Sequence, residues 1–430
     1  DDVTNDTTPT FDIVLNDDRL DEFTFINLAP DTTDDDAQTA AADYGVEVFN
    51  NGTSIGFAFY TGTGNLWQFT ASAGDLNEGH NNFITAATWV RDRATPNVIG
   101  TSDQQGPVNA LQVTLDTTPP NKSFGDPLIA NDGLHPDSDT GIADQPNLSV
   151  DRITSDTTPT FFGEAEANSI IRAFVVVDDN GTANPGDDTL VEIGKAVAIP
   201  LDGDEAFPAG AWELTSNIDM NDPNIFAVLP EDGIRTIRIT AEDKAGNLSE
   251  GMDLQIFIDT RGPQVEGVFV SDDRNYDLFD PKPSEDGPTP NVNSLDIDFI
   301  DQPPRGTGDF LYAAVNETLS TDPGNYLLVG DANGVIAIES IDFIDNTVAG
   351  DIGRTTIRLN FFEPLPDDRF TLTIIDDIKD DAGNQLDGES NASQPQELPD
   401  LPSGDGDPGG TFVARFTVDS RPELGTWSGG

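Results

Sequence analysis

Ser155-Asp156-Thr157-Thr158-Pro159-Thr160-Phe161 lies near the middle of this chain, and Asn5-Asp6-Thr7-Thr8-Pro9-Thr10-Phe11 matches it at six of seven positions. A second landmark, Leu115-Asp116-Thr117-Thr118-Pro119-Pro120, returns as Ile258-Asp259-Thr260-Arg261-Gly262-Pro263 and more loosely as Val418-Asp419-Ser420-Arg421-Pro422. The aspartates of these closing landmarks are 143 and 160 residues apart. This spacing is that of a whole domain rather than of a solenoid repeat.

The repeats divide the chain into residues 1–118 (module 1), 119–260 (module 2, beginning with an acidic linker) and 261–424 (module 3, with an acidic Gly/Pro-rich loop at 387–410). Within the modules, apolar and polar residues alternate with a period of two, as in 236–241, which is typical of strands with one buried face. Forty glycines and 30 prolines disfavour long helices. The sequence therefore predicts an all-β chain of three tandem antiparallel β-sandwich modules in an elongated array. For the 387–410 loop, an ordered surface excursion and disorder both remain open.

The charge of the chain is strongly negative, with 20 Lys and Arg against 79 Asp and Glu, a formal net charge of −59. Such a chain repels nucleic acid and anionic membranes, which excludes both as partners. Hydrophobic residues make up 36% of the sequence and fall in short alternating runs, so the chain can build cores despite its charge. Divalent cations bound by carboxylates would relieve the self-repulsion.

Cysteine is absent, which removes disulfides, thiolate metal sites and thiol nucleophiles. No apolar run is long enough to span a membrane, so no direct membrane insertion is expected. The chain starts at Asp1 and ends at Gly430 within a Gly/Ser-rich stretch, and we expect it to be a processed product or a fragment of a larger protein.

Residues 137–260 resemble the tandem immunoglobulin-like repeats of giant bacterial adhesins. The resemblance is carried by 155–161, Gly163-Glu164-Ala165, the Trp212 strand, Asp243-Lys244-Ala245-Gly246-Asn247 and the closing Asp259-Thr260. Module 3 is similar to a variant of these domains in very large surface proteins of planctomycete-like bacteria, through 277–283, 365–368 and 387–390. The resemblance implies immunoglobulin-like sandwiches that act as spacers and adhesive stalks and commonly bind calcium at their junctions. Module 3 lacks the Gly-x-Trp strand, so its sandwich is expected to be augmented or rearranged.

Several carboxylates are candidate calcium ligands, because calcium takes six to eight oxygen ligands from carboxylates and loop carbonyls. At the junction of modules 1 and 2 the candidates are Asp116, Asp137, Asp139, Asp144 and Asp156. Asp243 and Asp259 are expected to complete an equivalent site toward module 3. The alternative is that these are ordinary turn residues, since Asp and Asn favour turns for backbone reasons.

A further candidate is the loop 178–188, in which Asp178, Asn180 and Asp187 could bind a metal ion. Its spacing resembles a helix–loop–helix calcium loop only superficially, because the glycine expected at the sixth position is missing and strands flank it. The alternative is a long hairpin connection with Asn-Gly at its turn.

Catalytic interpretations are weak. Gly52-Thr53-Ser54-Ile55-Gly56 matches a hydrolase nucleophile motif, but strand-like residues lie on both sides of it, where the mechanism requires a strand, a turn and a helix. Trp67 and Trp212 could stack on sugars, yet their recurrence at equivalent positions predicts core residues. The sequence therefore predicts a protein that is not an enzyme.

The function expected from these features is a structural or adhesive stalk segment of a large extracellular bacterial surface protein, made rigid by calcium at its module junctions. Its partners would be neighbouring modules of the parent chain, with surface glycans or other cell-surface proteins also open. Two alternatives stand beside it: a segment of a cell-surface lattice or sheath, and spacer modules of a secreted polysaccharide-degrading enzyme.

Overall fold

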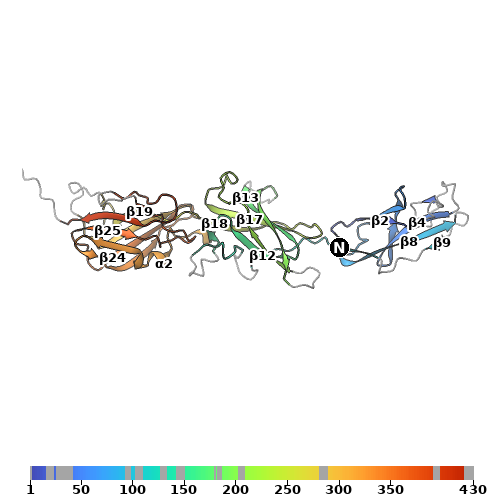
Figure 1. Cartoon of the computed structure of the whole chain (residues 1–430), viewed down its shortest axis with the longest axis horizontal. Coiled ribbons are helices and arrows are strands. Elements are labelled where there is room, and N and C mark those ends of the chain that lie inside the picture. Colours follow the sequence, from blue (N-terminus) through green and yellow to red (C-terminus); the bar gives the residue numbers. More distant parts are fainter. Residues whose placement is uncertain are drawn as a thin grey trace, which may run out of the picture.

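The structure is a computed structural model, and it confirms the predicted all-β fold built of β-sandwiches. The modules follow one another along the long axis of the molecule, with module 3 at the left of Figure 1 and module 1 at the right. Each module contributes two sheets. The residues that the structure describes are 2–15, 24–25, 42–92, 98–101, 110–125, 133–141, 151–178, 181, 186–201, 209–279, 289–390 and 398–420.

Module 1 is built from one large and one small sheet. The large sheet has the order β1-β10-β8-β4-β3, with β5 beside β4 and β9 beside β8, and the small sheet has the order β2-β7-β6. The first strand lies parallel to the last, so that the module begins and ends at the same edge. The strands are β1 (Asp2–Thr4), β2 (Thr10–Val14), β3 (Thr24–Phe25), β4 (Ala42–Asn50), β5 (Thr53–Phe57), β6 (Phe59–Tyr60), β7 (Leu66–Thr70), β8 (Gly79–Asp92), β9 (Val98–Thr101) and β10 (Leu111–Leu115).

Module 2 repeats this plan with sheets β11-β18-β17-β13-β14 and β12-β16-β15. Its first strand again lies parallel to its last, with Ile153 opposite Phe257. The strands are β11 (Ile153–Thr154), β12 (Thr160–Glu166), β13 (Ile170–Asp178), β14 (Thr189–Val197), β15 (Ile199–Pro200), β16 (Ala209–Thr215), β17 (Gly233–Glu242) and β18 (Met252–Ile258).

Module 3 departs from this plan, in line with the expectation of a rearranged sandwich. Its sheets have the orders β19-β20-β24-β23 and β22-β21-β25-β26, and its first strand pairs antiparallel with the second rather than parallel with the last. The strands are β19 (Gln264–Val270), β20 (Ser294–Asp301), β21 (Tyr326–Gly330), β22 (Gly334–Val335), β23 (Ile338–Asp345), β24 (Gly353–Phe361), β25 (Asp368–Ile374) and β26 (Phe412–Val418). Helix α2 (Glu317–Ser320) and the 3-10 helices η3 (Gly308–Phe310) and η4 (Pro323–Asn325) lie between β20 and β21.

The repeated Asp-Thr-Thr-Pro-Thr-Phe motif forms the same turn in modules 1 and 2. Asp6 Oδ1 accepts a hydrogen bond from the Thr8 amide at 2.8 Å, and Asp156 Oδ1 accepts one from the Thr158 amide at 2.8 Å. These turns directly precede β2 and β12. Asp156 therefore has a backbone role, which agrees with the turn alternative for this residue.

Both repeated tryptophans are core residues, as predicted. Trp67 is fully buried in β7 and Trp212 is 3% exposed in β16. Gly163, opposite Trp212 in the register, has no room for a side chain, because a Cβ there would lie 2.1 Å from the Ser123 carbonyl oxygen and 2.8 Å from the indole. Large apolar side chains between the two sheets form the core of each module.

The start of module 2 runs along the edge of its small sheet. Lys122 forms an isolated antiparallel bridge with Ala165, and Leu134 forms another with Phe161. The described parts of the acidic linker thus belong to the sandwich and lead from the module 1 end to the module 3 end.

The loops between strands gather at the two ends of each sandwich. Because β17 and β18 are antiparallel, the loop 243–251 between them lies at the end opposite to Asp259, which follows β18. This alternation decides which side chains meet at each junction.

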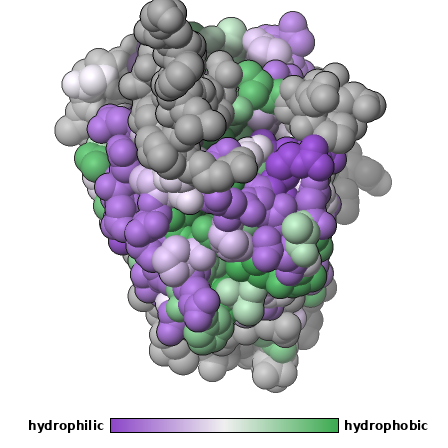
Figure 2. Space-filling view, turned by 90° about the vertical axis from the view of Figure 1, so that its left-hand side faces the viewer, coloured by the Kyte–Doolittle hydropathy of each residue, from purple (hydrophilic) through white to green (hydrophobic). Residues whose placement is uncertain are grey.

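The face at the module 3 end is mainly hydrophilic among the described residues, with smaller apolar areas between them (Figure 2). In the part of the chain that the structure describes, no helix is both long enough and apolar enough to cross a membrane. Gly52–Gly56 lies in the hairpin between β4 and β5, with Asn50 opposite Thr53, as the sequence predicts.

Candidate cation sites at the module junctions

Two short loops, Asp243–Asn247 and Asp380–Asn384, here called the AGN loops, have the same internal structure. In each, the aspartate carboxylate accepts hydrogen bonds from the main-chain and side-chain amides of the asparagine four residues later, at 2.8–2.9 Å. Gly246 and Gly383 have φ angles of 89° and 90°, a region that favours glycine. Each loop therefore presents its asparagine in a fixed orientation.

Each AGN loop contacts the closing aspartate of the preceding module. Asn247 Nδ2 donates to the main-chain oxygen of Asp116 at 2.7 Å, and Asn384 Nδ2 donates to that of Asp259 at 2.9 Å. The two junctions are thus built around an equivalent contact.

At the junction of modules 1 and 2, carboxylates from three segments interact electrostatically. Asp116 and Asp243 are buried, and Glu166 ends β12 beside them. Burial raises the pKa of Glu166 to about 7, and the charges of Asp116 and Asp243 add to this rise. Bringing like charges together disfavours ionisation unless a cation is shared between them.

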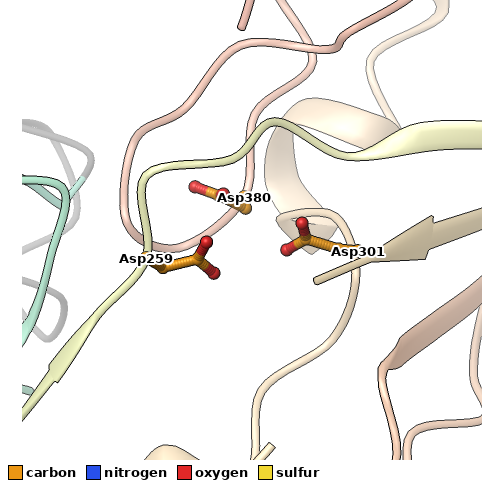
Figure 3. A group of neighbouring side chains, drawn as sticks. All are labelled: Asp259, Asp301 and Asp380. Atoms are coloured by element: carbon orange, nitrogen blue, oxygen red, sulfur yellow. The ribbon is translucent and has the colours of Figure 1, made fainter. Parts of the chain in front are cut away.

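At the junction of modules 2 and 3, Asp259, Asp301 and Asp380 form a buried group with carboxylate oxygens within 4.8 Å of one another (Figure 3). They follow β18, end β20 and begin the second AGN loop, respectively. Burial raises the pKa of each well above its usual range, and neighbouring carboxylates contribute further.

A guanidinium lies within this group. Arg305, fully buried, forms ion pairs with Asp259 (3.3 Å) and with Asp301. The Tyr312 hydroxyl also donates to Asp259. Asp301 Oδ1 is buried and has no hydrogen-bond partner. One positive charge thus faces three carboxyl groups.

A second acidic group, Asp139, Asp151 and Asp381, lies at the same junction. Asp139 is 7% exposed, and the backbone amides of Arg152 and Gly141 lie close enough to its carboxylate to act against the rise in its pKa, although neither makes a hydrogen bond of good geometry. Burial raises the pKa of Asp139 to about 7 and that of Asp151 to about 8, the latter with contributions from the charges of Asp139 and Asp381. A side chain of module 2, Thr140, donates to the Ala382 carbonyl at 2.7 Å nearby.

A third group lies within module 3, where Asp387, Glu389 and Asp405 bring carboxylate oxygens within 4.8 Å of one another. The described part of the 387–410 loop wraps around it, and Asp387 accepts hydrogen bonds from the amides of Asp405 and Gly406 at 2.9 and 3.1 Å. That part of the loop is an ordered excursion, whereas 391–397 lies outside the described residues.

The structure groups the predicted ligands differently from the sequence-based expectation. Asp116 is joined by Asp243 at the first junction, whereas Asp139 and Asp259 lie at the second. The reason is that successive strands run in opposite directions, so Asp243 and Asp259 mark opposite ends of module 2.

The remaining candidates do not join these groups. Asp137 is an exposed side chain, Asp156 caps a turn, and Asp178 and Asp187 are exposed at the hairpin between β13 and β14. Asp144 and Asn180 lie outside the described residues.

Sequence reasoning missed several members of the junction groups. Asp380 and Asp381 carry a signal, since their loop repeats the Ala-Gly-Asn of 245–247. The others have no recognisable spacing: Asp151, Glu166, Asp301 and Arg305.

The donor chemistry of the junctions fits calcium. At the second junction Asp259, Asp301 and Asp380 bring carboxylate oxygens from separate segments within 4.8 Å of one another, and Asp139 presents two further buried carboxylate oxygens. Hard oxygen ligands of this kind suit calcium or magnesium, and the absence of cysteine excludes thiolate metal sites.

Comparisons with known proteins give no close relative. No family model matches the chain, and no curated protein matches it in sequence. Similar solved structures include fibronectin(III)-like modules of Clostridium thermocellum CbhA (TM-score 0.20, 11% identity, 50% of this chain and 77% of that chain). Another is Dpr2 Ig1-Ig2 in complex with DIP-Theta Ig1-Ig3 (TM-score 0.23, 9% identity, 82% of this chain and 90% of that chain). A third is a Bacteroides ovatus glucan-utilization protein, SGBP-B, in complex with a heptasaccharide (TM-score 0.15, 11% identity, 97% of this chain and 65% of that chain). At these values, the similarities carry no argument about function.

Proposed function

We propose that this chain is a non-catalytic stalk segment of an extracellular bacterial surface protein, and that calcium at its module junctions holds the modules in line. The observation that carries the proposal is the repeated junction contact. Two AGN loops, 137 residues apart in sequence, each hydrogen-bond to the closing aspartate of the preceding module beside buried carboxylates. A repeated contact of this kind ties each module to the next at the same point.

A bound cation would supply the positive charge that these groups of carboxylates lack. At the first junction Asp116, Asp243 and Glu166 would hold it, and at the second Asp139, Asp151 and Asp381 would do so. A divalent ion between segments of two modules replaces mutual repulsion by shared coordination. Extracellular sites of this class bind calcium with dissociation constants of about 10⁻⁴ to 10⁻³ M, which suits an environment rich in calcium.

The test is isothermal titration calorimetry of the full chain with calcium, combined with differential scanning calorimetry in calcium and in EDTA. At a hundredfold excess over the dissociation constant, one site should stabilise the folded state by about 2.7 kcal/mol. We expect binding of more than one ion and a rise of several degrees in the melting temperature of the chain. Asp137→Asn is a control, because this side chain is exposed and lies outside both groups.

The result against the proposal would be equal melting temperatures in calcium and EDTA, with no binding heat. Concentration-dependent filaments in calcium would instead favour the lattice or sheath alternative over a monomeric stalk.

A further inference from the structure

The two junctions share the AGN contact but differ in their surroundings. At the second junction an apolar cluster joins the modules, with Ile153 and Phe257 of module 2 packed against Phe310, Tyr312 and Ala382 of module 3. The ring of Phe257 lies 5.8 Å from that of Phe310 and 5.6 Å from that of Tyr312. Among the described residues, no buried apolar cluster joins module 1 to module 2.

Arg305 is the second difference. Its guanidinium bridges Asp259 of module 2 and Asp301 of module 3, and it lies 3.7 Å above the centre of the Tyr312 ring. Because guanidinium groups stay protonated at all physiological pH values, the charge is permanent.

The surroundings hold Arg305 in this position. Its Nε donates to the Tyr312 carbonyl at 3.2 Å and its Nη1 to the Pro303 carbonyl at 3.0 Å. Gly353 leaves space for the group, since a Cβ there would lie 2.7 Å from Nη2. The buried charge is therefore both paired and hydrogen-bonded, the condition under which burial is tolerated.

At the first junction the corresponding group is acidic. The neighbouring charges that raise the pKa of Glu166 are those of Asp116 and Asp243, and both are negative. Lys122 lines a cleft of about 280 Å³ with Glu166, and its charge interacts with Glu250. The contacts described across this junction are polar, from Asn247 to the carbonyl oxygens of Asp116 and Thr118.

We propose that Arg305 is a built-in cation that keeps modules 2 and 3 docked with or without bound metal, so that removal of calcium bends the chain only between modules 1 and 2. The part concerning Arg305 stands independently, whereas the part concerning the first junction rests on the proposed function. A stalk of this design has one permanently fixed joint and one joint that responds to calcium.

The absence of cysteine allows a direct test by double electron–electron resonance on the full chain. Spin labels at Gln68→Cys and Glu213→Cys report on the first junction, and labels at Glu213→Cys and Leu327→Cys report on the second. All three positions are exposed. Each pair is measured in calcium and in EDTA, in the otherwise native chain and with Arg305→Met and Arg305→Lys.

We expect the label pair across the second junction to give an equally narrow distance distribution in both buffers. The distance distribution of the pair across the first junction should become at least twofold wider in EDTA. Arg305→Met should widen the distance distribution of the second pair in EDTA. Arg305→Lys, which keeps the charge, should widen it less. Broadening of the second pair in EDTA without any change at Arg305 would overturn the proposal, as would a narrow distribution in Arg305→Met.

The failure of the proposed function gives a different pattern. If neither distance distribution changes between calcium and EDTA, the proposal that calcium stiffens the junctions is wrong. A wider distribution of the second pair in Arg305→Met would still support the role of Arg305 as a built-in cation. If Arg305→Met does not fold, hydrogen exchange of the otherwise native chain in EDTA decides. A protected amide at Tyr312, whose ring packs on Phe257 across the junction, then supports the proposal, and rapid exchange there contradicts it.

Discussion

Asn384 Nδ2 lies 2.9 Å from the main-chain oxygen of Asp259, so that module 3 holds the closing aspartate of module 2 by its backbone. The same asparagine satisfies the buried carboxylate of Asp380. A single amide side chain thus joins two modules and hydrogen-bonds a buried acid.

Replacement of Asn384 by Ala should weaken the second junction. It removes the contact with Asp259 and takes one hydrogen-bond donor from the buried Asp380, at a cost of about 1–3 kcal/mol. Scanning calorimetry should show a lower melting temperature for module 3. Glu339→Ala, at an exposed position of β23 in the same module, is the control and should have little effect. Equal losses in the two variants would contradict the role of Asn384.

The buried acids of module 2 predict a pH dependence of stability in EDTA. The pKa of Asp139 is about 7 and that of Asp151 about 8 in the folded chain, against about 3.9 for an unfolded Asp. The folded state therefore binds more protons than the unfolded state between these values. Its free energy of unfolding should fall as the pH rises from about 4 to 8. Urea denaturation at several pH values measures this.

Asp139→Asn should flatten that dependence, since an amide does not titrate, whereas the exposed Asp137→Asn should leave it unchanged. Calcium should also restore stability at pH 8 in the otherwise native chain. A pH dependence of the same slope in Asp139→Asn would show that burial of this group is not its cause.

The strand pattern was readable from sequence because burial alternates along each strand. Ile237, Ile239 and Ala241 are fully buried in β17, as their period of two requires. The tryptophans of β7 and β16 were likewise recognisable as core from their repeated position. The strand order of module 3 could not be predicted from the sequence, because pairing between distant strands leaves no local pattern.

The junction sites were only partly predictable for the same reason. The Ala-Gly-Asn repeat identifies both loops, but the partner of each loop depends on which end of the sandwich it occupies. Asp301 and Arg305 approach Asp259 across 42 and 46 residues of sequence. No spacing rule links them, since the ends of β18 and β20 meet only when modules 2 and 3 pack together.

Gly163→Ala should destabilise module 2, because the added methyl group would overlap the Ser123 carbonyl and the Trp212 ring. Overpacking of this kind costs about 1–3 kcal/mol. Urea denaturation followed by tryptophan fluorescence measures the loss. Glu213→Ala, an exposed position beside Trp212, is the control and should stay within about 0.5 kcal/mol of the original stability. An unchanged Gly163→Ala variant would show that the linker at Ser123 can move aside.

Asp296→Asn should destabilise module 3 at neutral pH. Burial acts to raise the pKa of Asp296, but hydrogen bonds from Arg358, Ser271 and Arg274 outweigh it and lower the pKa below the usual value. The ionised form therefore stabilises the fold above about pH 4, and this contribution is lost as the pH falls through the folded-state pKa. Loss of charge-assisted hydrogen bonds should cost about 1.5–3 kcal/mol at pH 7.

The difference between Asp296→Asn and the original chain should shrink as the pH falls below 4, because the native carboxyl is then neutral as well. Glu339→Gln, at an exposed acid of β23 in the same sheet, is the matched control and should show neither the loss at pH 7 nor its disappearance in acid. Denaturant titrations at pH 7 and pH 3 compare the three proteins. A deficit of Asp296→Asn that is equal at both pH values would mean that the amide disturbs packing, and that the ion pairs with Arg358 and Arg274 do not stabilise the sheet.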